Sequence, residues 1–145
     1  MPKVMKHLNN ISRSQTTFRR ARLDSELMPT YHTYVLAICR RPGVTQDMLA
    51  KDICVNKSTV ARRLDWLSER GYVERTASSE DKRCLLVYPT EKMLAVLPTV
   101  RKIAAEWNAI ITDGIPEDEL AVFESVLSKM EERAKAATVG CGGDM

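Results

Sequence analysis

Apolar residues recur every three or four positions near both ends of the chain, which is the pattern of one buried helix face. The first repeat runs from Val4 to Phe18. The second runs from Met93 to Ile110 and alternates steps of three and four, as the seam of a coiled coil does. A third repeat follows Gly114 and Pro116, residues that end one helix and begin the next. The chain is therefore expected to begin with one long helix and to end with two.

Shorter apolar segments, separated by capping and breaking residues, lie between these long repeats. Pro29 opens a helix that ends at Pro42, and Thr45 is suited to cap a short helix directly after it. Asn56 is suited to cap a fourth helix, and Gly71 is the residue type that ends helices in the left-handed conformation. The pattern predicts two helices joined by a tight turn.

A β-hairpin is predicted after the fourth helix. Strand-like residues occupy 72–76 and 83–88, and a polar tip at 77–81 separates them. Two helices, a tight turn and a hairpin in succession form a winged helix-turn-helix. The expected fold class is mostly α with a small β-hairpin wing (α+β).

The long terminal helices carry more apolar surface than one small lobe can cover. Leu94, Leu97, Ala104 and Ile111 widen the seam of the second repeat. A partner chain is therefore expected. The predicted organisation is one domain at 1–137, with a winged lobe at 28–89, dimerisation helices at 1–22 and 90–137, and a disordered tail at 138–145.

The 145 residues fit one domain, and their charge is unevenly distributed. Residues 1–22 contain six basic residues and no acidic ones, whereas residues 117–137 contain six acidic residues and three basic ones. This asymmetry indicates a face that meets a polyanion, although a solvated helix with uneven charge explains it equally well.

Several classes of protein lack support in the sequence. No run of apolar residues is long enough for a membrane span, and no secretory signal is present, so a cytoplasmic location is expected. We find no nucleophile–base pair and no phosphate loop, so no enzyme activity and no cofactor are predicted. Four scattered cysteines without CxxC spacing favour free thiols over a disulfide framework: Cys39, Cys54, Cys84 and Cys141.

The fourth helix has two chemically distinct faces when its residues are placed at helical spacing. Val60, Leu64 and Leu67 share the side that faces the core, and the opposite side begins with Ser58 and Arg62. In a helix-turn-helix, the first residues of the second helix reach base edges in the major groove. Arg62 is the best candidate for base reading, because a guanidinium pairs bidentately with guanine.

Asp65 and Glu69 lie farther along this exposed face, where the duplex is expected to curve away. Arg63 projects to the flank of the apolar side, where its stem packs or its guanidinium reaches phosphate.

Four stretches of the sequence resemble the MarR family of regulators: Val44–Ala50, Asn56–Arg62, Leu67–Arg75 and Ser79–Arg83. The most specific element is Asp81-Lys82-Arg83, an Asp-x-Arg in the wing after a Leu-x-x-x-Gly-hydrophobic-hydrophobic helix end. The sequence departs from the family pattern at three places. Cys54 replaces a common glycine, Arg63 replaces an apolar residue, and Pro89–Met93 replaces Leu-Thr-x-x-Gly.

The resemblance implies a homodimeric transcription regulator, acting as a repressor on double-stranded DNA at a palindromic operator and released by a small aromatic or apolar ligand. It also implies that Asp81 braces the wing while Arg83 enters the minor groove, since a narrow minor groove attracts arginine. On this interpretation the carboxylate holds the long side chain before binding, and a plain salt bridge within the wing is the alternative.

The candidate DNA-binding residues come from the two helices of the motif and from the wing. They are Thr45, Gln46, Asn56, Lys57, Ser58, Thr59, Arg62, Arg63, Asp81, Lys82 and Arg83. The resemblance also implies a ligand pocket between the dimer base and the DNA lobe. Its candidates are Ile11, Gln15, Tyr31, Tyr34 and Trp107, which an ordinary core explains at least as well.

Three other functions stay open. Cys54 lies in the turn before the fourth helix, where oxidation would disturb DNA binding, although a cysteine there also serves as a small apolar residue. A metal sensor is disfavoured because His7 and His32 are isolated and no cluster has ligand spacing. A winged helix used only for protein contact is disfavoured by the basic residues Lys57 and Arg62.

Overall fold

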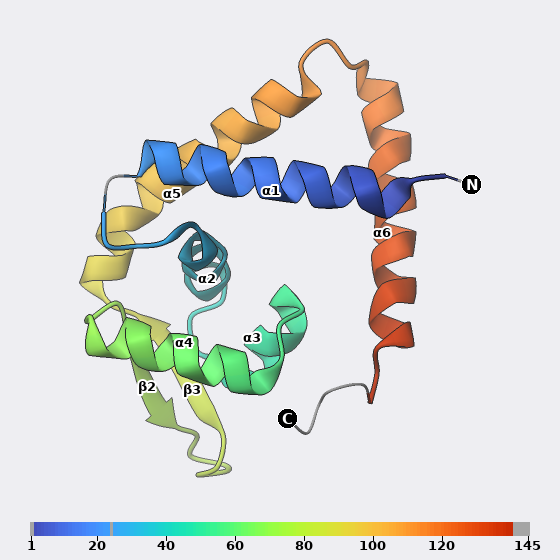
Figure 1. Cartoon of the computed structure of the whole chain (residues 1–145). Helices are drawn as coiled ribbons and strands as arrows, with labels where there is room; N and C mark the ends of the chain where they lie inside the picture. Colours follow the sequence, from blue (N-terminus) through green and yellow to red (C-terminus); the bar gives the residue numbers. More distant parts are fainter. Residues whose placement is uncertain (1, 24, 141–145) are drawn as a thin grey trace.

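The computed structural model describes residues 2–23 and 25–140, and Figure 1 shows a compact lobe flanked by long helices. The helices are α1 (Val4–Arg22), α2 (Pro29–Arg40), α3 (Gln46–Ile53), α4 (Lys57–Glu69), α5 (Glu91–Thr112) and α6 (Glu117–Ala137). The strands are β1 (Val44–Thr45), β2 (Val73–Ala77) and β3 (Leu85–Pro89). The mostly helical fold with a small wing is the one that the sequence predicts.

The lobe packs α2, α3 and α4 against the small sheet and the start of α5. Its centre is fully buried and includes Leu49, Val60, Leu64 and Leu67. Ile53 and Val55, in and after the end of α3, are partly buried against that core. The predicted apolar side of α4 is therefore its inner side, and its other side is left for solvent.

The predicted helix caps of the lobe are confirmed. Thr45 Oγ1 accepts a hydrogen bond from the Met48 amide at 3.1 Å, and Asn56 Oδ1 accepts one from the Thr59 amide at 2.8 Å. Gly71 has φ +81°, the left-handed conformation expected after α4. These local interactions define where α3 and α4 begin and where α4 ends.

The sheet differs from the prediction in the number of its strands and in their bounds. It has three antiparallel strands in the order β1-β3-β2, because Val44 and Thr45 pair with Val87 and Leu86. β2 starts at Val73 and β3 at Leu85, so the strands predicted from residues 72 and 83 begin one and two residues too early. Residues 78–84 form the wing tip, and Arg83 of the Asp-x-Arg motif lies in this turn instead of in a strand.

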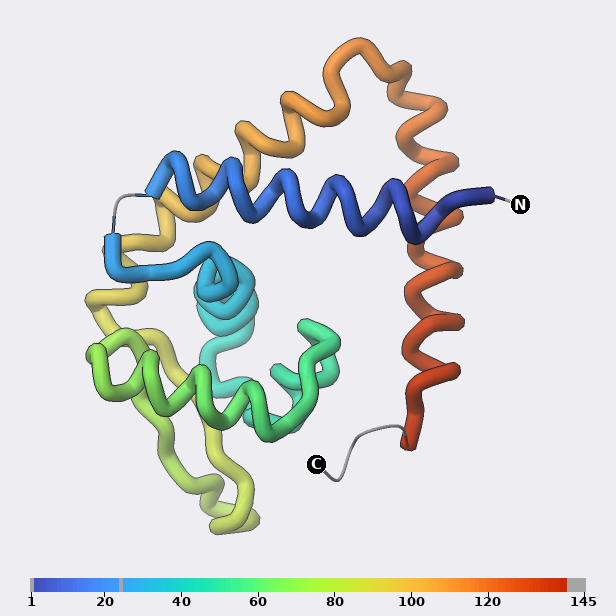
Figure 2. Tube along the Cα trace, in the orientation of Figure 1, coloured from blue at the N-terminus to red at the C-terminus, as the bar shows by residue number. Residues whose placement is uncertain are grey.

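The long helices α1, α5 and α6 frame the lobe from outside. Figure 2 shows α6 standing away from the lobe, beyond a turn that follows α5. Within the described chain, α1 and α6 contain no buried residue. Large apolar side chains are exposed on α6, with Phe123 at 50% and Val126 at 45%. The apolar face of α6 is therefore left uncovered by the single chain, whereas that of α1 is partly covered, because Phe18 contacts Trp107 of α5.

The end of α6 modifies one prediction. Thr138 and Val139 donate main-chain hydrogen bonds to Lys135 and Ala136, so the predicted disordered tail begins inside a turn that closes the helix. The remainder of that tail, 141–145, lies outside the described residues. None of the described helices combines the length and apolar character required to cross a membrane.

Candidate nucleic-acid interface

The first turn of α4 holds its polar side chains in a hydrogen-bonded chain. Asn56 Oδ1 accepts from Ser58 Oγ at 2.9 Å as well as from the helix amide, and Arg62 Nη2 donates to Thr59 Oγ1 at 3.3 Å. Ser58 and Arg62 are exposed, whereas Thr59 is half-buried. The structure thus brings four of the predicted residues together at the solvent-facing start of this helix. The exposed part of the cluster presents one guanidinium and one hydroxyl group.

The start of α3 lies beside this turn and contributes more candidates. Thr45 uses its hydroxyl oxygen as the cap of α3. Lys57 Nζ lies 3.6 Å from an Asp47 carboxylate oxygen, and both side chains are largely exposed. An exposed ion pair of this kind contributes about 1 kcal/mol or less and is screened by salt. Lys57 can therefore leave Asp47 at little cost in stability.

The wing tip is a tight turn built around Asp81. Its carboxylate accepts the Arg83 main-chain N–H at 3.0 Å, and its carbonyl accepts the Cys84 N–H at 2.9 Å. Asp81 therefore braces the wing, but through the backbone, and the expectation that its carboxylate holds the Arg83 side chain is wrong. Lys82 and Arg83 are exposed and form no ion pair within the part of the chain that is described. The wing presents two unpaired cations at its tip.

One predicted DNA-binding residue lies elsewhere. The guanidinium of Arg63 lies over the ring of Tyr31, 5.7 Å from its centroid, and the side chain is half-buried. Arg63 therefore faces α2, and its packing replaces the predicted approach to phosphate. The position flanks the apolar side of α4, where a long side chain covers a ring better than it reaches outward.

Arg75 was missed by the sequence analysis, although it joins the wing to both helices of the motif. It lies on β2 and contacts Asp65 of α4 and Gln46 of α3. Strand alternation offered a signal, because Arg75 shares its side of β2 with the buried Val73. A cation at an inward position of a strand requires a partner, and Asp65 provides one.

The candidates for the ligand pocket fall into different surroundings. Tyr31 and Tyr34 are buried in the lobe core, with ring centroids 5.9 Å apart. Trp107 instead contacts Phe18, with centroids 5.2 Å apart, at the packing of α1 on α5. Gln15 is half-buried and Ile11 is exposed. The structure therefore places the two tyrosines as core residues, as the alternative interpretation holds.

Two buried polar side chains on α2 have no hydrogen-bond partner among the described residues. They are His32, at both ring nitrogens, and Tyr34, at its hydroxyl oxygen. Burial, with a smaller contribution from the nearby Arg19 charge, lowers the pKa of His32 to about 4. Burial also raises the pKa of Tyr34. Both groups are therefore neutral at physiological pH, and His32 is buried in the lobe.

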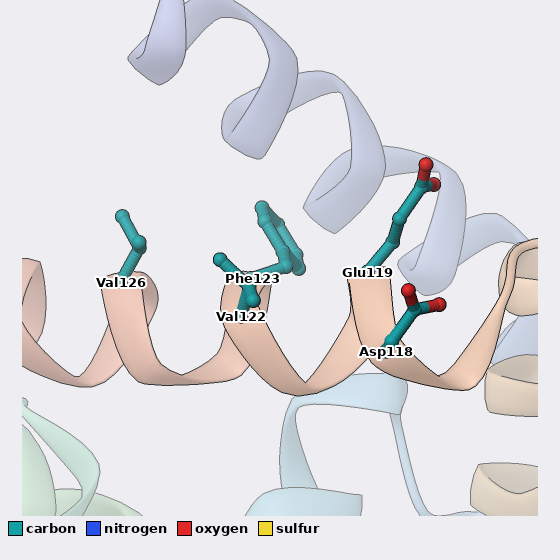
Figure 3. A pocket seen from close by; sticks show the side chains of 5 residues that line it. All are labelled: Asp118, Glu119, Val122, Phe123 and Val126. Carbon is teal, nitrogen blue, oxygen red and sulfur yellow. The ribbon is translucent and has the colours of Figure 1, made fainter.

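The remaining chemical candidates are few. Cys54 occupies the turn between α3 and α4 with φ +55°, which explains why glycine is common at this place, and its thiol is exposed. Over the described ranges, no group of three or more histidine, cysteine, aspartate or glutamate side chains is placed to hold a metal ion. A shallow hollow on α6 is lined by Asp118, Glu119, Val122, Phe123 and Val126, and Figure 3 shows these side chains along one helix.

Helix α4 exposes a polar side that begins with Ser58 and Arg62, which we call the reading face. Together with α3 and with a wing that exposes Lys82 and Arg83, it defines a winged helix-turn-helix protein. Residues 28–85 match the model of the MarR family. A curated relative, the uncharacterized HTH-type transcriptional regulator YybA of Bacillus subtilis (strain 168), is 23% identical over 133 residues, which cover 91% of this chain and 89% of YybA.

Two solved structures share the fold of this chain. A crystal structure of MarR is 28% identical, with a TM-score of 0.78 over 97% of this chain and 95% of the other. A putative MarR family transcriptional regulator from Listeria monocytogenes, complexed with 26mer DNA, is 21% identical, with a TM-score of 0.90 over 98% of this chain and 97% of the other. The winged lobe of this chain, residues 28–85, therefore matches the MarR family, and the chain as a whole has the fold of these regulators.

Proposed function

We propose that the protein binds double-stranded DNA in a sequence-specific manner, as a homodimer on a palindromic operator. The observation that carries this proposal is the joint exposure of the α4 reading face and the two unpaired wing cations. The start of α4 would enter the major groove, with Arg62 reading bases and Ser58 contacting base or phosphate. The Listeria monocytogenes protein of the same fold was solved with DNA, which supports this use of the fold.

The wing would contact the adjacent minor groove. Asp81 holds the backbone of the turn, and the exposed Arg83 guanidinium has no ion-pair partner among the described residues. A narrow minor groove concentrates negative potential, and an arginine held at the tip of a hairpin is suited to it. Lys57 and Lys82 would add phosphate contacts, which give affinity without sequence information.

The homodimer is supported by the apolar surface that one chain leaves uncovered. Ile110 on α5 is 56% exposed, and Phe123 on α6 is 50% exposed. Both residues belong to one-sided apolar repeats, which soluble monomers rarely expose. The α6 hollow is edged by Asp118 and Glu119, and α1 of a second copy is basic and apolar, so the two surfaces are complementary.

We propose repression as the mode of regulation, because a dimer bound across two half-sites covers the DNA between them. Release by a small aromatic or apolar ligand stays a prediction of the family resemblance. Such a ligand would have to bind more tightly to one spacing of the two reading helices, since only differential affinity shifts an equilibrium. The alternative of redox sensing at Cys54 predicts that peroxide lowers operator affinity.

Selection of bound sequences from a random duplex pool tests the proposed function. The expected product is a palindrome with half-sites about one helical turn apart. Binding of that duplex should weaken steeply with salt, because phosphate contacts release counterions. A pool that shows no enrichment, or binding that ignores salt, would favour a winged helix that contacts only proteins.

Two variants separate base reading from general affinity. Arg62→Ala is expected to relax sequence preference, whereas Arg83→Ala should lower affinity on all duplexes. Arg40→Ala is a matched control, because it removes an exposed arginine at the end of α2, which is assigned neither to the DNA-binding residues nor to the dimerisation helices. Equal losses on every sequence for both test variants would contradict the separate roles.

A further inference from the structure

Arg75 connects three elements of the proposed interface through one guanidinium. Its Nη2 donates to Asp65 Oδ1 at 2.7 Å, and its Nη1 donates to Gln46 Oε1 at 3.1 Å. The Arg75 side chain is 21% exposed, whereas that of Asp65 is 58% exposed. We propose that Arg75 is a positioning residue for DNA recognition, which sets the wing against α3 and α4, orients the amide that Gln46 offers to the duplex and neutralises Asp65.

The bond to Gln46 determines the orientation of an amide at the edge of the interface. Arginine has only donors, so the amide of Gln46 must turn its oxygen toward Arg75. Its two N–H donors are left for another partner, and phosphate oxygens are acceptors only. Gln46 is the first residue of α3, next to the Thr45 cap. Arg75 thus makes the Gln46 amide, which can donate or accept, a hydrogen-bond donor toward solvent at the start of α3.

The bond to Asp65 neutralises a carboxylate on the reading side of α4. Asp65 follows Arg62 by three residues, on the same exposed side of the helix. Without a partner, its charge would oppose the approach of the duplex to Arg62, about one helical turn away. A planar guanidinium satisfies a carboxylate and an amide oxygen at once, which a lysine ammonium does with less directional control.

The same contacts fix the wing relative to the reading helix. Arg75 pairs with Val87 of β3 in the sheet, so its guanidinium transmits the position of the hairpin to α3 and α4. The wing tip lies at the far end of this hairpin. A small rotation at Arg75 would therefore displace the tip with Lys82 and Arg83, and the two groove contacts would no longer fit one duplex together.

The experiment compares two duplexes, and it rests on the proposed function. The first is the palindrome recovered by selection, and the second is a scrambled duplex of equal length and composition. Enrichment and salt-dependent binding by the unmodified protein establish DNA recognition before any variant is measured. The readout is the ratio of the two dissociation constants, together with the salt dependence of each.

Four variants are measured, with circular dichroism and thermal unfolding as checks of the fold. Arg75→Lys keeps the charge, and Asp65→Asn removes the carboxylate. The double variant Arg75→Met/Asp65→Asn keeps the net charge of the chain but removes the connection. Glu69→Gln is the matched control, since Glu69 is an exposed acid on the same side of α4 without an ion pair in the described structure.

Positioning by Arg75 predicts that the specificity ratio falls about tenfold in Arg75→Lys, in Asp65→Asn and in the double variant, which is the size of one poorly read base pair. The salt dependence of the double variant should equal that of the unmodified protein. Glu69→Gln should leave the ratio unchanged, although it raises affinity for both duplexes by removing a repulsive charge.

Three results would overturn the proposal. An unchanged ratio in Arg75→Lys and Asp65→Asn would show that the connection does not affect recognition. A ratio restored in the double variant would reduce the role of Arg75 to neutralising Asp65. A salt dependence weaker by about one counterion in the double variant would make Arg75 a direct phosphate contact. Arg75→Lys and Asp65→Asn still decide the question if the double variant fails to fold.

Discussion

The winged lobe and the long helices around it bury their apolar residues to very different degrees. In the lobe, Leu49, Val60, Leu64 and Leu67 have no exposed surface at all. On α1 and α6, in contrast, the structure shows no buried side chain among the described residues. Both regions have amphipathic sequences, so composition does not separate them. The difference teaches that the lobe is complete within one chain and that the outer helices are not.

The apolar residues of helix α5 change from buried to exposed along its length. Its early apolar positions, such as Met93 and Val100, are buried against the lobe, whereas Ile110 is 56% exposed. The same heptad seam runs through both halves. A continuous pattern in the sequence thus becomes two surfaces, one covered by the chain itself and one that a partner would cover.

The largest effect is expected from a charge placed on the uncovered face of α6. Phe123→Glu would bury a carboxylate twice in a symmetric dimer, at a cost of about 3 kcal/mol or more for each copy. Sedimentation velocity should then show monomers at concentrations where the unmodified protein is dimeric. Ser125→Glu, on the opposite side of the helix, is the control. If the Phe123→Glu protein remains dimeric, the exposed face of α6 is not the surface that a partner chain covers.

A large effect is also expected from a cavity in the lobe. Leu64→Ala should lower the free energy of unfolding by about 3 kcal/mol, the usual cost of deleting a buried leucine side chain. Leu94→Ala removes the same atoms from a side chain that is 48% exposed, and it should cost far less. Urea unfolding measures both. Equal losses would mean that Leu94 is as well packed in solution as Leu64.

An intermediate effect is expected from pH, and it belongs to the lobe. The pKa of His32 is lowered to about 4 in the folded protein, below its usual 6.5, so the unfolded chain takes up the proton first. Stability from the neutral imidazole is therefore present at neutral pH and is lost as pH falls from 6.5 toward 4. Between about pH 7.5 and pH 5, the free energy of unfolding should fall by about 2 kcal/mol.

The control for this pH effect is a second histidine outside the lobe. His32→Leu should abolish most of the loss in urea unfolding, whereas His7→Gln on α1 should leave it intact. If the free energy of unfolding falls equally in the unmodified protein and in both variants, groups other than His32 cause the pH dependence.

The smallest of these effects is expected at the first turn of α4. Asn56→Ala removes the cap of the helix and should cost about 1 kcal/mol of stability, measured by urea unfolding. It also releases Ser58, so operator affinity should fall together with stability. Asn10→Ala on α1 is a control, because Asn10 lies in the interior of α1 (Val4–Arg22) and caps no helix end. An unchanged stability in Asn56→Ala would show that the turn holds its shape without the cap.

The parts of the fold that depend on local chemistry were predictable from the sequence. Thr45 and Asn56 cap helices because their side chains bond to amides three residues away, and no distant contact is required. The family resemblance was also local, since it rested on the two helices and the Asp81-Lys82-Arg83 turn. Confirmation by the family model covers the same part of the chain.

The parts that depend on distant pairing were not predictable. β1 exists only because Val44 meets Val87, more than forty residues later. For Arg63 the sequence left packing and a phosphate contact open, and only the fold shows that it lies over Tyr31 of α2. Arg75 finds partners on two other elements at once. In each case a side chain or a strand is placed by residues far away in the sequence, which periodicity and capping do not reveal.

The two tryptophans of the chain fall one in each region. Trp66 is stacked on Tyr31, with centroids 4.5 Å apart, in the lobe, and Trp107 contacts Phe18 among the outer helices. Intrinsic fluorescence therefore contains a separate reporter for each region. Trp66→Phe would leave the fluorescence of Trp107 in the outer helices, and Trp107→Phe would leave that of Trp66 in the lobe. A dilution series followed in both variants would show whether loss of the partner loosens the outer helices before the lobe unfolds.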